Sequence, residues 1–384
     1  MDRFIATTPF FSAAHRALAE RVAEFAERQI APRASGDESD VDSALRAYVR
    51  LLAENDFLKF AVATLDESFD LRAFCIIRET LSYSSSLADL AFVMQGLGTY
   101  AISRAATEHV RDFWLGRARN GQAIAAFALT EPDAGSDVAA LKTTALREGD
   151  AYIIDGRKRF ISNAGVADFY TVFARTGTRE DGRAEISAFV VSARMSGFAV
   201  AERTEMIAPH PIGELEFKDC RVPAEDMIGN QGDGLRLALQ TLDVFRASVG
   251  AAACGMARRA LDESLRHAKS REQFDKPLSG HQLIQEKLAD MATELDAARL
   301  LVYRAAYLKD AGAEPSTREA SEAKLFATEA AGRIVDQAVQ IHGGTGLVRG
   351  SIVERLYRDV RALRIYEGTS EIQKLVIANQ LLKE

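Results

Sequence analysis

The stretch Ala151–Ser162, AYIIDGRKRFIS, decides how the chain is divided, because a helical pattern gives way here to a period near two. Such a period is typical of a strand with one buried face. The pair Asp155-Gly156 within this stretch predicts a hairpin turn between two strands. Similar short runs follow between turn residues: FYTVFART (169–176), EISAFVV (185–191), GFAVAE (197–202) and GELEFKD (213–219). Residues 123–232 are therefore expected to form an antiparallel β domain.

Helical patterns lie on both sides of this β region. Residues 12–31 carry apolar side chains near a helical period and precede Pro32, and residues 71–120 continue in the same way. The polar residues 33–43 predict a loop. After residue 233 apolar residues again recur at spacings of four and three, within long alanine-rich segments that suit a bundle. The fold class is therefore α+β, with a helical domain at 1–122, a β domain at 123–232 and a C-terminal four-helix bundle at 233–384.

Composition limits the classes of function. The 384 residues carry a formal net charge of -7, which argues against a nucleic-acid-binding protein. The three cysteines show no CxxC spacing and the six histidines form no HExxH pattern, so no metal site is expected. The N-terminus does not resemble a signal peptide, and no apolar run reaches the roughly 18 residues of a membrane helix. A cytoplasmic protein is the expectation.

Four segments contain groups that suit a phosphate or a polar ring, and each also has a plainer structural interpretation. TEPDAGSD (130–137) offers hydroxyls and a glycine, or simply forms a turn. RKRFISNA (157–164) sets a hydroxyl beside an aromatic ring, or is a half-buried strand. In REQF (271–274) the arginine suits a pyrophosphate, or the segment is a solvated helix end. QIHGGTG (340–346) exposes backbone amides, or forms a helix C-cap.

The fifth segment is Tyr366-Glu367-Gly368-Thr369-Ser370-Glu371. A carboxylate directly before Gly-Thr-Ser is expected to lie at a bend ahead of a helix, with Thr369 or Ser370 as the helix cap. Glu367 is then either a reactive carboxylate or an acid that is favoured by the helix dipole. Taken alone, the segment leaves both interpretations open.

Taken together and in this order, the five segments resemble the motifs of the acyl-CoA dehydrogenase family. The resemblance runs from HRALAERVAEFAERQIAPRA (15–34) to RALRIYEGTSEIQKLVIANQLL (361–382). Its most distinctive phrases are TEPDAGSD, SREQFDKPLSGHQ (270–282), QIHGGTG and RIYEGTSEIQ (364–373). The resemblance implies three domains in the order helical, β and helical, a homotetramer, and noncovalent FAD that is held between subunits.

The resemblance also assigns roles to individual residues. Glu367 is the implied catalytic base, which removes the α-proton of an acyl-CoA thioester while hydride passes to flavin N5. Electron-transferring flavoprotein is the implied oxidant of the reduced flavin. The implied FAD-binding residues are Phe127, Thr130, Phe160, Ser162, Arg271, Phe274, Gln282, Gln340, Gly343, Gly344, Thr369 and Glu371. The implied substrate-binding residues are Ser136, Asp243, Arg246, Tyr366 and Gly368.

Three departures from the family pattern are visible. The stretch DFLKFAVATLDESFDLRAF (56–74) lacks the Tyr-Gly-Gly phrase that relatives often have after the early helices. His210 stands between Pro209 and Pro211, where relatives often have a short Ser/Thr stretch. Some relatives take their base from the helix that holds Asp243, but this chain has Val244 and Phe245 before Arg246, so that base is absent.

Three other functions remain open on the same fold. An oxidase or monooxygenase that uses O₂ is one, although relatives of that kind often lose the glutamate of the EGTS phrase, which this chain keeps. A dehydrogenase that acts on acyl groups carried by a carrier protein is another. A non-enzymatic nucleic-acid-binding relative is the third, and the acidic charge balance argues against it.

Overall fold

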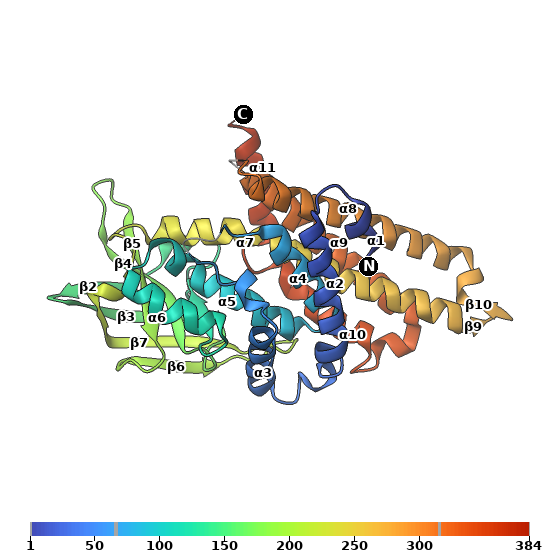
Figure 1. Cartoon of the computed structure of the whole chain (residues 1–384), viewed down its shortest axis with the longest axis horizontal. Helices are drawn as coiled ribbons and strands as arrows, with labels where there is room; N and C mark the ends of the chain where they lie inside the picture. Colours follow the sequence, from blue (N-terminus) through green and yellow to red (C-terminus); the bar gives the residue numbers. More distant parts are fainter. Residues whose placement is uncertain (1, 65–67, 314–315, 384) are drawn as a thin grey trace. The chain divides into compact units, whose positions relative to one another are not determined.

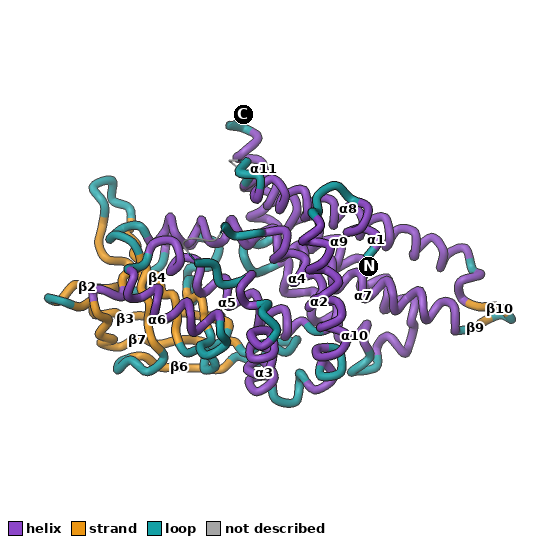
Figure 2. The backbone as a smooth tube through the Cα atoms, viewed as in Figure 1, coloured by secondary structure: helices purple, strands orange, loops and turns teal. Residues whose placement is uncertain are grey.

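The computed structural model describes residues 2–64, 68–313 and 316–383. The chain forms two compact units, which we name by their main content. The helical unit comprises Met1–Glu38, Asp70–Asp89 and Asp243–Glu384. The β unit comprises Ser39–Phe69 and Leu90–Leu242. Figure 2 shows the long helices in purple and the strands of the main sheet in orange.

The helical unit is built on three long helices that run side by side, namely α7, α8 and α9 (Figure 1). A short hairpin of β9 and β10 joins α7 to α8. The elements of this unit are α1 (Arg3–Thr7), α2 (Ala13–Phe25), α4 (Leu71–Ser84), most of α7 (Gly234–Ser270), β9 (Glu272–Gln273), β10 (Lys276–Pro277), α8 (Gln282–Asp310), α9 (Thr317–His342), α10 (Ile352–Val360) and α11 (Ser370–Leu381).

Small residues allow the long helices to approach closely. A Cβ atom on Gly250 of α7 would lie 2.7 Å from Val302 Cγ2 of α8 and 3.2 Å from the Ala323 carbonyl oxygen of α9. On α9 the buried face is largely alanine, so the neighbouring backbones can pack without large side chains between them. A glycine and an alanine-rich helix therefore fix the spacing of the bundle.

The β unit contains a sheet with the strand order β6-β7-β3-β2-β4-β5-β8, and β1 pairs with β4. Within the described residues, this sheet has eight strands. The elements are α3 (Val41–Glu54), most of α5 (Ser86–Ala105), α6 (Glu108–Arg119), β1 (Ala125–Ala128), β2 (Thr144–Glu148), β3 (Ala151–Ser162), β4 (Phe169–Thr178), β5 (Ala184–Ser192), β6 (Phe198–Arg203), β7 (Ile212–Pro223) and β8 (Met227–Ile228).

Most strand pairs are antiparallel, as expected, but β1 and β2 pair with β4 in parallel. The first six residues of β4 are all buried, which fits a strand that is covered on both faces. The β domain expected from the sequence is therefore a largely antiparallel sheet around a strand whose first six residues are buried.

The predicted hairpin turn at Asp155-Gly156 is wrong. Strand β3 runs straight through this pair, and the turn that joins β2 to β3 lies at Gly149-Asp150. At Gly156 the register of β3 against β7 shifts, and φ is +146°. A Cβ atom on Gly156 would lie 2.6 Å from Thr143 Oγ1. The glycine therefore serves a β-bulge with close packing rather than a turn.

The expected helices are present. Residues 12–31 form α2 and a π-helical turn, residues 71–120 form α4, α5 and α6, and the C-terminal patterns form α7, α8 and α9. The last helix, α11, begins at Ser370 rather than at Ile365, because the chain bends at Glu367. The loop expected at 33–43 is shorter, since α3 begins at Val41. All three cysteines are buried thiols.

No helix among the described residues is both long enough and apolar enough to cross a membrane.

Candidate active site

The bend before α11 has an unusual backbone. Glu367 has a φ of +54° and Gly368 a φ of +90°, both in the left-handed region. A non-glycine residue in this region costs roughly 1–3 kcal/mol, so the surrounding structure must hold it there. Thr369 is the N-cap of α11, and its hydroxyl accepts a hydrogen bond from the Ile372 amide. The predicted bend and the predicted cap are both confirmed.

Two buried side chains hold this bend, one from a helix before it in the sequence and one from the helix after it. Gln373 of α11 donates from Nε2 to the carbonyl oxygens of Glu367 (3.2 Å) and Gly368 (3.0 Å). Lys324 of α9 donates from Nζ to the carbonyl oxygen of Gly368 at 2.6 Å. A Cβ atom on Gly368 would lie 2.5 Å from Gln373 Nε2. The strained backbone is therefore fixed by hydrogen bonds that require a glycine at position 368.

One oxygen of the Glu367 carboxylate has no hydrogen-bond partner among the described residues. Its Oε2 atom is buried and accepts no hydrogen bond within the described part of the chain. Burial raises the pKa of Glu367, although the nearby cations Arg78, Lys324 and Arg246 act in the opposite direction. Such a carboxylate binds a proton more readily than an exposed one, and its free lone pairs can take the proton from a ligand.

The three cations around Glu367 differ in how they are paired. Arg78 is fully buried and forms a two-point ion pair with Asp89, with distances of 2.8 and 2.7 Å, and it also donates to Ser248 Oγ at 2.9 Å. Arg246 Nη1 binds Asp243 Oδ1 at 2.7 Å, while its Nε is buried without a partner in the described residues. Burial lowers the pKa of Lys324 to about 8, so its ammonium is charged at neutral pH. The charges favour the carboxylate form of Glu367 without covering it.

The structure thus gathers one set of predicted residues. Glu367, Tyr366 and Gly368 form the bend, and the charge of Arg246 acts on the Glu367 carboxylate. Asp243 contacts this group through Arg246 and also accepts a hydrogen bond from Thr317 Oγ1 at 2.9 Å. Two buried polar atoms without partners, Glu367 Oε2 and Arg246 Nε, are what a site that awaits a polar ligand requires.

A second set lies in the β unit, near the end of β3. The Arg159 amide donates to the Thr130 carbonyl oxygen at 2.9 Å, which sets the TEPDAGSD turn beside Phe160. Phe160 is 49% exposed with a φ of +55°, and Ser162 follows two residues later. An exposed aromatic ring next to a hydroxyl suits the face and edge of a planar ring system.

Phe127 and Ser136, the other two predicted residues of the β unit, have separate surroundings. Phe127 of β1 packs against Phe173, with ring centroids 5.0 Å apart. Ser136 lies on the exposed part of the turn. Neither has a contact that tests the role which the resemblance implies.

A third set lies at the tip of the bundle. Arg271 and Gln282 are exposed, and Phe274 of the β9–β10 hairpin is 87% exposed. Around Gly343 and Gly344 a Cβ atom would meet nothing within 4 Å, so this backbone is open to a ligand. Figure 1 shows the hairpin at the far ends of α7 and α8, away from α11. The structure therefore does not bring these residues to Glu367 within one chain.

The last three predicted contacts lie at the ends of helices. Gly343 is the C-cap of α9, with a φ of +58°, so its plain structural interpretation is also fulfilled. Gln340 is exposed on the last turn of α9, and Glu371 is exposed on the first turn of α11.

Sequence reasoning missed several residues that shape these sites. Lys324 and Arg78 hold charges on helix faces that are largely apolar, and this was the signal that could have found them. Gln373 contacts the bend, and His210 contacts Ser162. No spacing pattern in the sequence predicts either contact.

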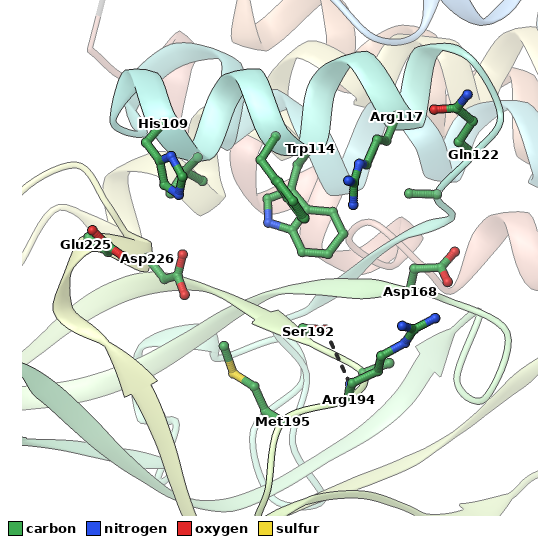
Figure 3. Close-up of a pocket in the computed structure, with 14 residues that line it drawn as sticks. His109, Trp114, Arg117, Gln122, Asp168, Ser192, Arg194, Met195, Glu225 and Asp226 are labelled. Carbon is green, nitrogen blue, oxygen red and sulfur yellow. Dashed lines mark hydrogen bonds between the residues drawn. The ribbon is translucent and has the colours of Figure 1, made fainter.

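The β unit also has an open pocket of about 410 Å³ between α6 and the segment that follows β5 (Figure 3). Figure 3 shows Trp114 and His109 on the helix side, and Arg194 and Met195 on the opposite side. Burial and the neighbouring Glu225 raise the pKa of Asp226 in this pocket to about 6. None of the residues predicted from the sequence lines it.

Comparison with known proteins agrees with this geometry. The N-terminal, middle and C-terminal domain profiles of acyl-CoA dehydrogenases match residues 12–122, 126–220 and 232–382. The 3-(aryl)acrylate reductase of Clostridium sporogenes is 40% identical over 381 residues, which is 97% of this chain and 100% of the relative.

Solved structures show the same fold. Butyryl-CoA dehydrogenase of Megasphaera elsdenii has a TM-score of 0.89 at 32% identity and covers 97% of this chain and 99% of its own. A glutaryl-CoA dehydrogenase of Mycobacterium smegmatis in complex with FADH2 has a TM-score of 0.89 at 28% identity, covering 98% and 97% of the two chains. The chain belongs to the acyl-CoA dehydrogenase family.

Proposed function

We propose that this chain catalyses the FAD-dependent α,β-dehydrogenation of an acyl-CoA thioester, with Glu367 as the base. The observation that carries the proposal is the Glu367 carboxylate itself. It is held at a left-handed bend, its pKa is raised by burial, and its buried Oε2 has no hydrogen-bond partner among the described residues. A carboxylate in ordinary structural use would be paired or solvated.

The residues of the bend suit proton abstraction next to a thioester carbonyl. Glu367 takes the α-proton, and the electron pair of the broken C–H bond moves toward the carbonyl oxygen. The backbone amide of Glu367 is proposed to donate to that oxygen and stabilise its developing charge. Gln373 and Lys324 keep the carbonyls of the bend occupied, so the backbone cannot relax out of this geometry. Bound FAD supplies the acceptor for the β-hydride.

The residues present fit such a cofactor. The open backbone at Gly343 and Gly344 can approach a pyrophosphate, and exposed Arg271 offers a guanidinium for it. The FAD ring would lie against Thr130, Phe160 and Ser162. Phe127, Phe274, Gln282, Gln340, Thr369 and Glu371 complete the proposed FAD-binding residues.

The acyl-CoA is proposed to contact Ser136, Asp243, Arg246, Tyr366 and Gly368. Support comes from the unpaired and buried Nε of Arg246, which can still donate one hydrogen bond to a ligand.

Reduction of an α,β-unsaturated acyl group is a second candidate, favoured by the name of the C. sporogenes relative, a 3-(aryl)acrylate reductase. The same groups serve this direction, because a buried glutamate whose pKa is raised can also hold a proton and deliver it to the α-carbon. In the dehydrogenase direction a saturated thioester reduces the flavin. In the reductase direction an unsaturated thioester oxidises the reduced flavin.

An anaerobic titration of the purified flavoprotein with a panel of acyl-CoAs tests the proposal. Bleaching of the flavin by at least one saturated acyl-CoA is expected for a dehydrogenase. Reoxidation of prereduced flavin by an enoyl-CoA, without bleaching by any saturated partner, would favour the reductase. Denaturation of the yellow protein should release FAD, and release of FMN would contradict the cofactor assignment.

We also propose that the chain works as a homotetramer with FAD shared between subunits. The support is that the residues proposed for the pyrophosphate lie at the bundle tip, where Phe274 is 87% exposed. Light scattering should give a multiple of 42.0 kDa. A fully active holo monomer would refute the shared site.

The electron acceptor, the location and the domain boundaries are also parts of this proposal. Electron-transferring flavoprotein is the proposed oxidant, and the cytoplasm is the proposed location. The division into domains at 1–122, 123–232 and 233–384 is supported by the ranges of the three family profiles.

A further inference from the structure

A histidine that the proposed reaction does not use is hydrogen-bonded to the hydroxyl of Ser162. The Nε2 atom of His210 lies 2.8 Å from Ser162 Oγ. Ser162 is the last residue of β3, and His210 lies in the segment that leads into β7. This contact joins two side chains of the β unit that lie 48 positions apart in the sequence.

The backbone on both sides holds the two side chains in place. Ser162 is paired with Ile212 in the register of β3 and β7, and the Asn163 amide donates to the Pro211 carbonyl oxygen at 2.6 Å. Asn163 is itself buried, and its side chain donates to the Ala125 carbonyl oxygen at 2.9 Å. His210 lies between two prolines, each of which fixes one backbone angle. The backbone that carries both side chains is therefore held by this strand pair.

The imidazole is neutral at physiological pH, because burial lowers the pKa of His210 to about 4. A neutral imidazole has one ring nitrogen that donates and one that accepts. A serine hydroxyl has a single hydrogen atom to donate. If Ser162 donated to His210, its outward side would offer only lone pairs. If His210 donates to Ser162, the hydroxyl hydrogen is free to point outward.

We propose that His210 is a positioning residue whose Nε2–H donates to Ser162 Oγ, so that the Ser162 hydroxyl is presented as a hydrogen-bond donor. This inference rests on the proposed function, in which the FAD ring lies against Ser162, and we take the Ser162 hydroxyl to face the ring nitrogen N5, which is unprotonated in oxidised FAD. N5 can only accept a hydrogen bond, so only an outward-directed donor suits it. The tautomer of one half-buried histidine thus sets the polarity of the cofactor contact.

Magic-angle-spinning ¹⁵N spectra of histidine-labelled holoprotein test the tautomer directly. In wild type at pH 7, the His210 signal should show a protonated Nε2 and an unprotonated Nδ1. In Ser162→Ala the Nε2 resonance should shift, because its acceptor is gone. A His210 that is protonated at Nδ1 alone, a doubly protonated imidazole, or a spectrum unaffected by Ser162→Ala would overturn the proposal.

FAD affinity provides the second readout, from the fluorescence of FAD released when holoprotein is diluted. His210→Leu and Ser162→Ala should each weaken binding about two- to tenfold, as expected for one neutral hydrogen bond. The double variant should be no weaker than either single variant, because both remove the same contact. His210→Gln, whose amide can donate, should recover most of the loss. Additive losses, or no recovery with glutamine, would refute the positioning role.

His109→Leu, which removes an exposed histidine of the same unit, is the matched control and should leave FAD affinity unchanged. Failure of the proposed function looks different from failure of this inference. If the purified protein never binds FAD, the proposed function fails, yet the same spectra, recorded on the apoprotein of wild type and Ser162→Ala, still decide whether His210 donates to Ser162.

Discussion

Replacing Glu131 with glutamine removes a negative charge from a place where its partner has no access to water. Lys158 has a side-chain exposure of 0% and Glu131 one of 5%, and their charged atoms lie 2.8 Å apart. The second carboxylate oxygen accepts a hydrogen bond from the Lys142 amide at 2.6 Å. The ion pair therefore anchors the TEPDAGSD turn to β3.

The size of the effect follows from the cost of leaving Lys158 alone. Removing one partner of a buried pair typically costs roughly 3–5 kcal/mol. The penalty is limited by the alternative of deprotonating the lysine. Wild-type Lys158 has a folded-state pKa of about 8, so deprotonating it costs only about 1.4 kcal/mol at pH 7; the rest of the loss comes from the Lys142 and Thr143 amides, which lose a carboxylate acceptor. Glu131→Gln should therefore lower the free energy of unfolding by about 3–5 kcal/mol at pH 7.

The sign of the pH dependence is also determined. Burial lowers the pKa of Lys158 to about 8 even with Glu131 opposing it, and in the variant that opposition is gone. The unfolded state then binds one more proton than the folded state up to the ordinary pKa of lysine. Stability of the variant should rise with pH by about 1.4 kcal/mol per unit. Wild-type Lys158 keeps its proton up to about pH 8, so wild type gains less stability than the variant between pH 7 and 9. The difference between their free energies of unfolding should therefore narrow.

Urea unfolding followed by tryptophan fluorescence measures this effect. Trp114 is the single tryptophan and packs on Phe169 of the β unit, with ring centroids 4.4 Å apart. Asp133→Asn, which breaks the exposed pair of Asp133 with Lys142, is the control and should cost no more than about 1 kcal/mol. If the free energy of unfolding of Glu131→Gln lies within about 1 kcal/mol of wild type at pH 7, and the difference does not narrow by pH 9, the ion pair does not anchor the turn.

The remaining predictions concern the bend. Lys324→Met should raise the pKa of Glu367, because loss of a nearby cation disfavours the carboxylate. The acid limb of the pH profile of kcat/KM should therefore move to higher pH. An acid limb at the wild-type pH would contradict this. Gly368→Ala should lower both kcat and the unfolding temperature. Position 368 has a φ of +90°, and a Cβ atom there would lie 2.5 Å from Gln373 Nε2. Wild-type values of both quantities would show that the bend is not strained. Arg246→Ala should raise KM about 10- to 100-fold with a smaller change in kcat, as expected for a charge-assisted contact of about 1.5–3 kcal/mol, and an unchanged KM would remove it from the site.

The order of helical and β regions could be predicted because each rests on local periodicity. The bend at Glu367 could also be predicted, since a carboxylate before Gly-Thr-Ser combines a flexible residue with a helix cap. The hairpin at Asp155-Gly156 was wrong because the same dipeptide serves a bulge where Thr143 packs against the strand. Local sequence does not reveal which neighbour will approach a glycine.

The contacts that tune the site could not be predicted for the same reason. Lys324 reaches the Gly368 carbonyl across 44 positions of sequence, and His210 reaches Ser162 across 48. Each is decided by how elements pack, and neither leaves a spacing pattern. A charge on an alanine-rich helix face marks Lys324 as unusual, but only the packed structure shows what it holds.

The most direct test of the central claim is flavin reduction in Glu367→Gln, measured by anaerobic stopped-flow with the best acyl-CoA. Glutamine keeps the size of the side chain but cannot accept the α-proton, and removal of a general base typically slows such a step about 10²–10⁴-fold. FAD content and substrate binding should persist, and the control Glu148→Gln, exposed at the end of β2, should reduce its flavin at the wild-type rate. Bleaching should nearly vanish in Glu367→Gln alone; bleaching at the wild-type rate would show that the base is elsewhere.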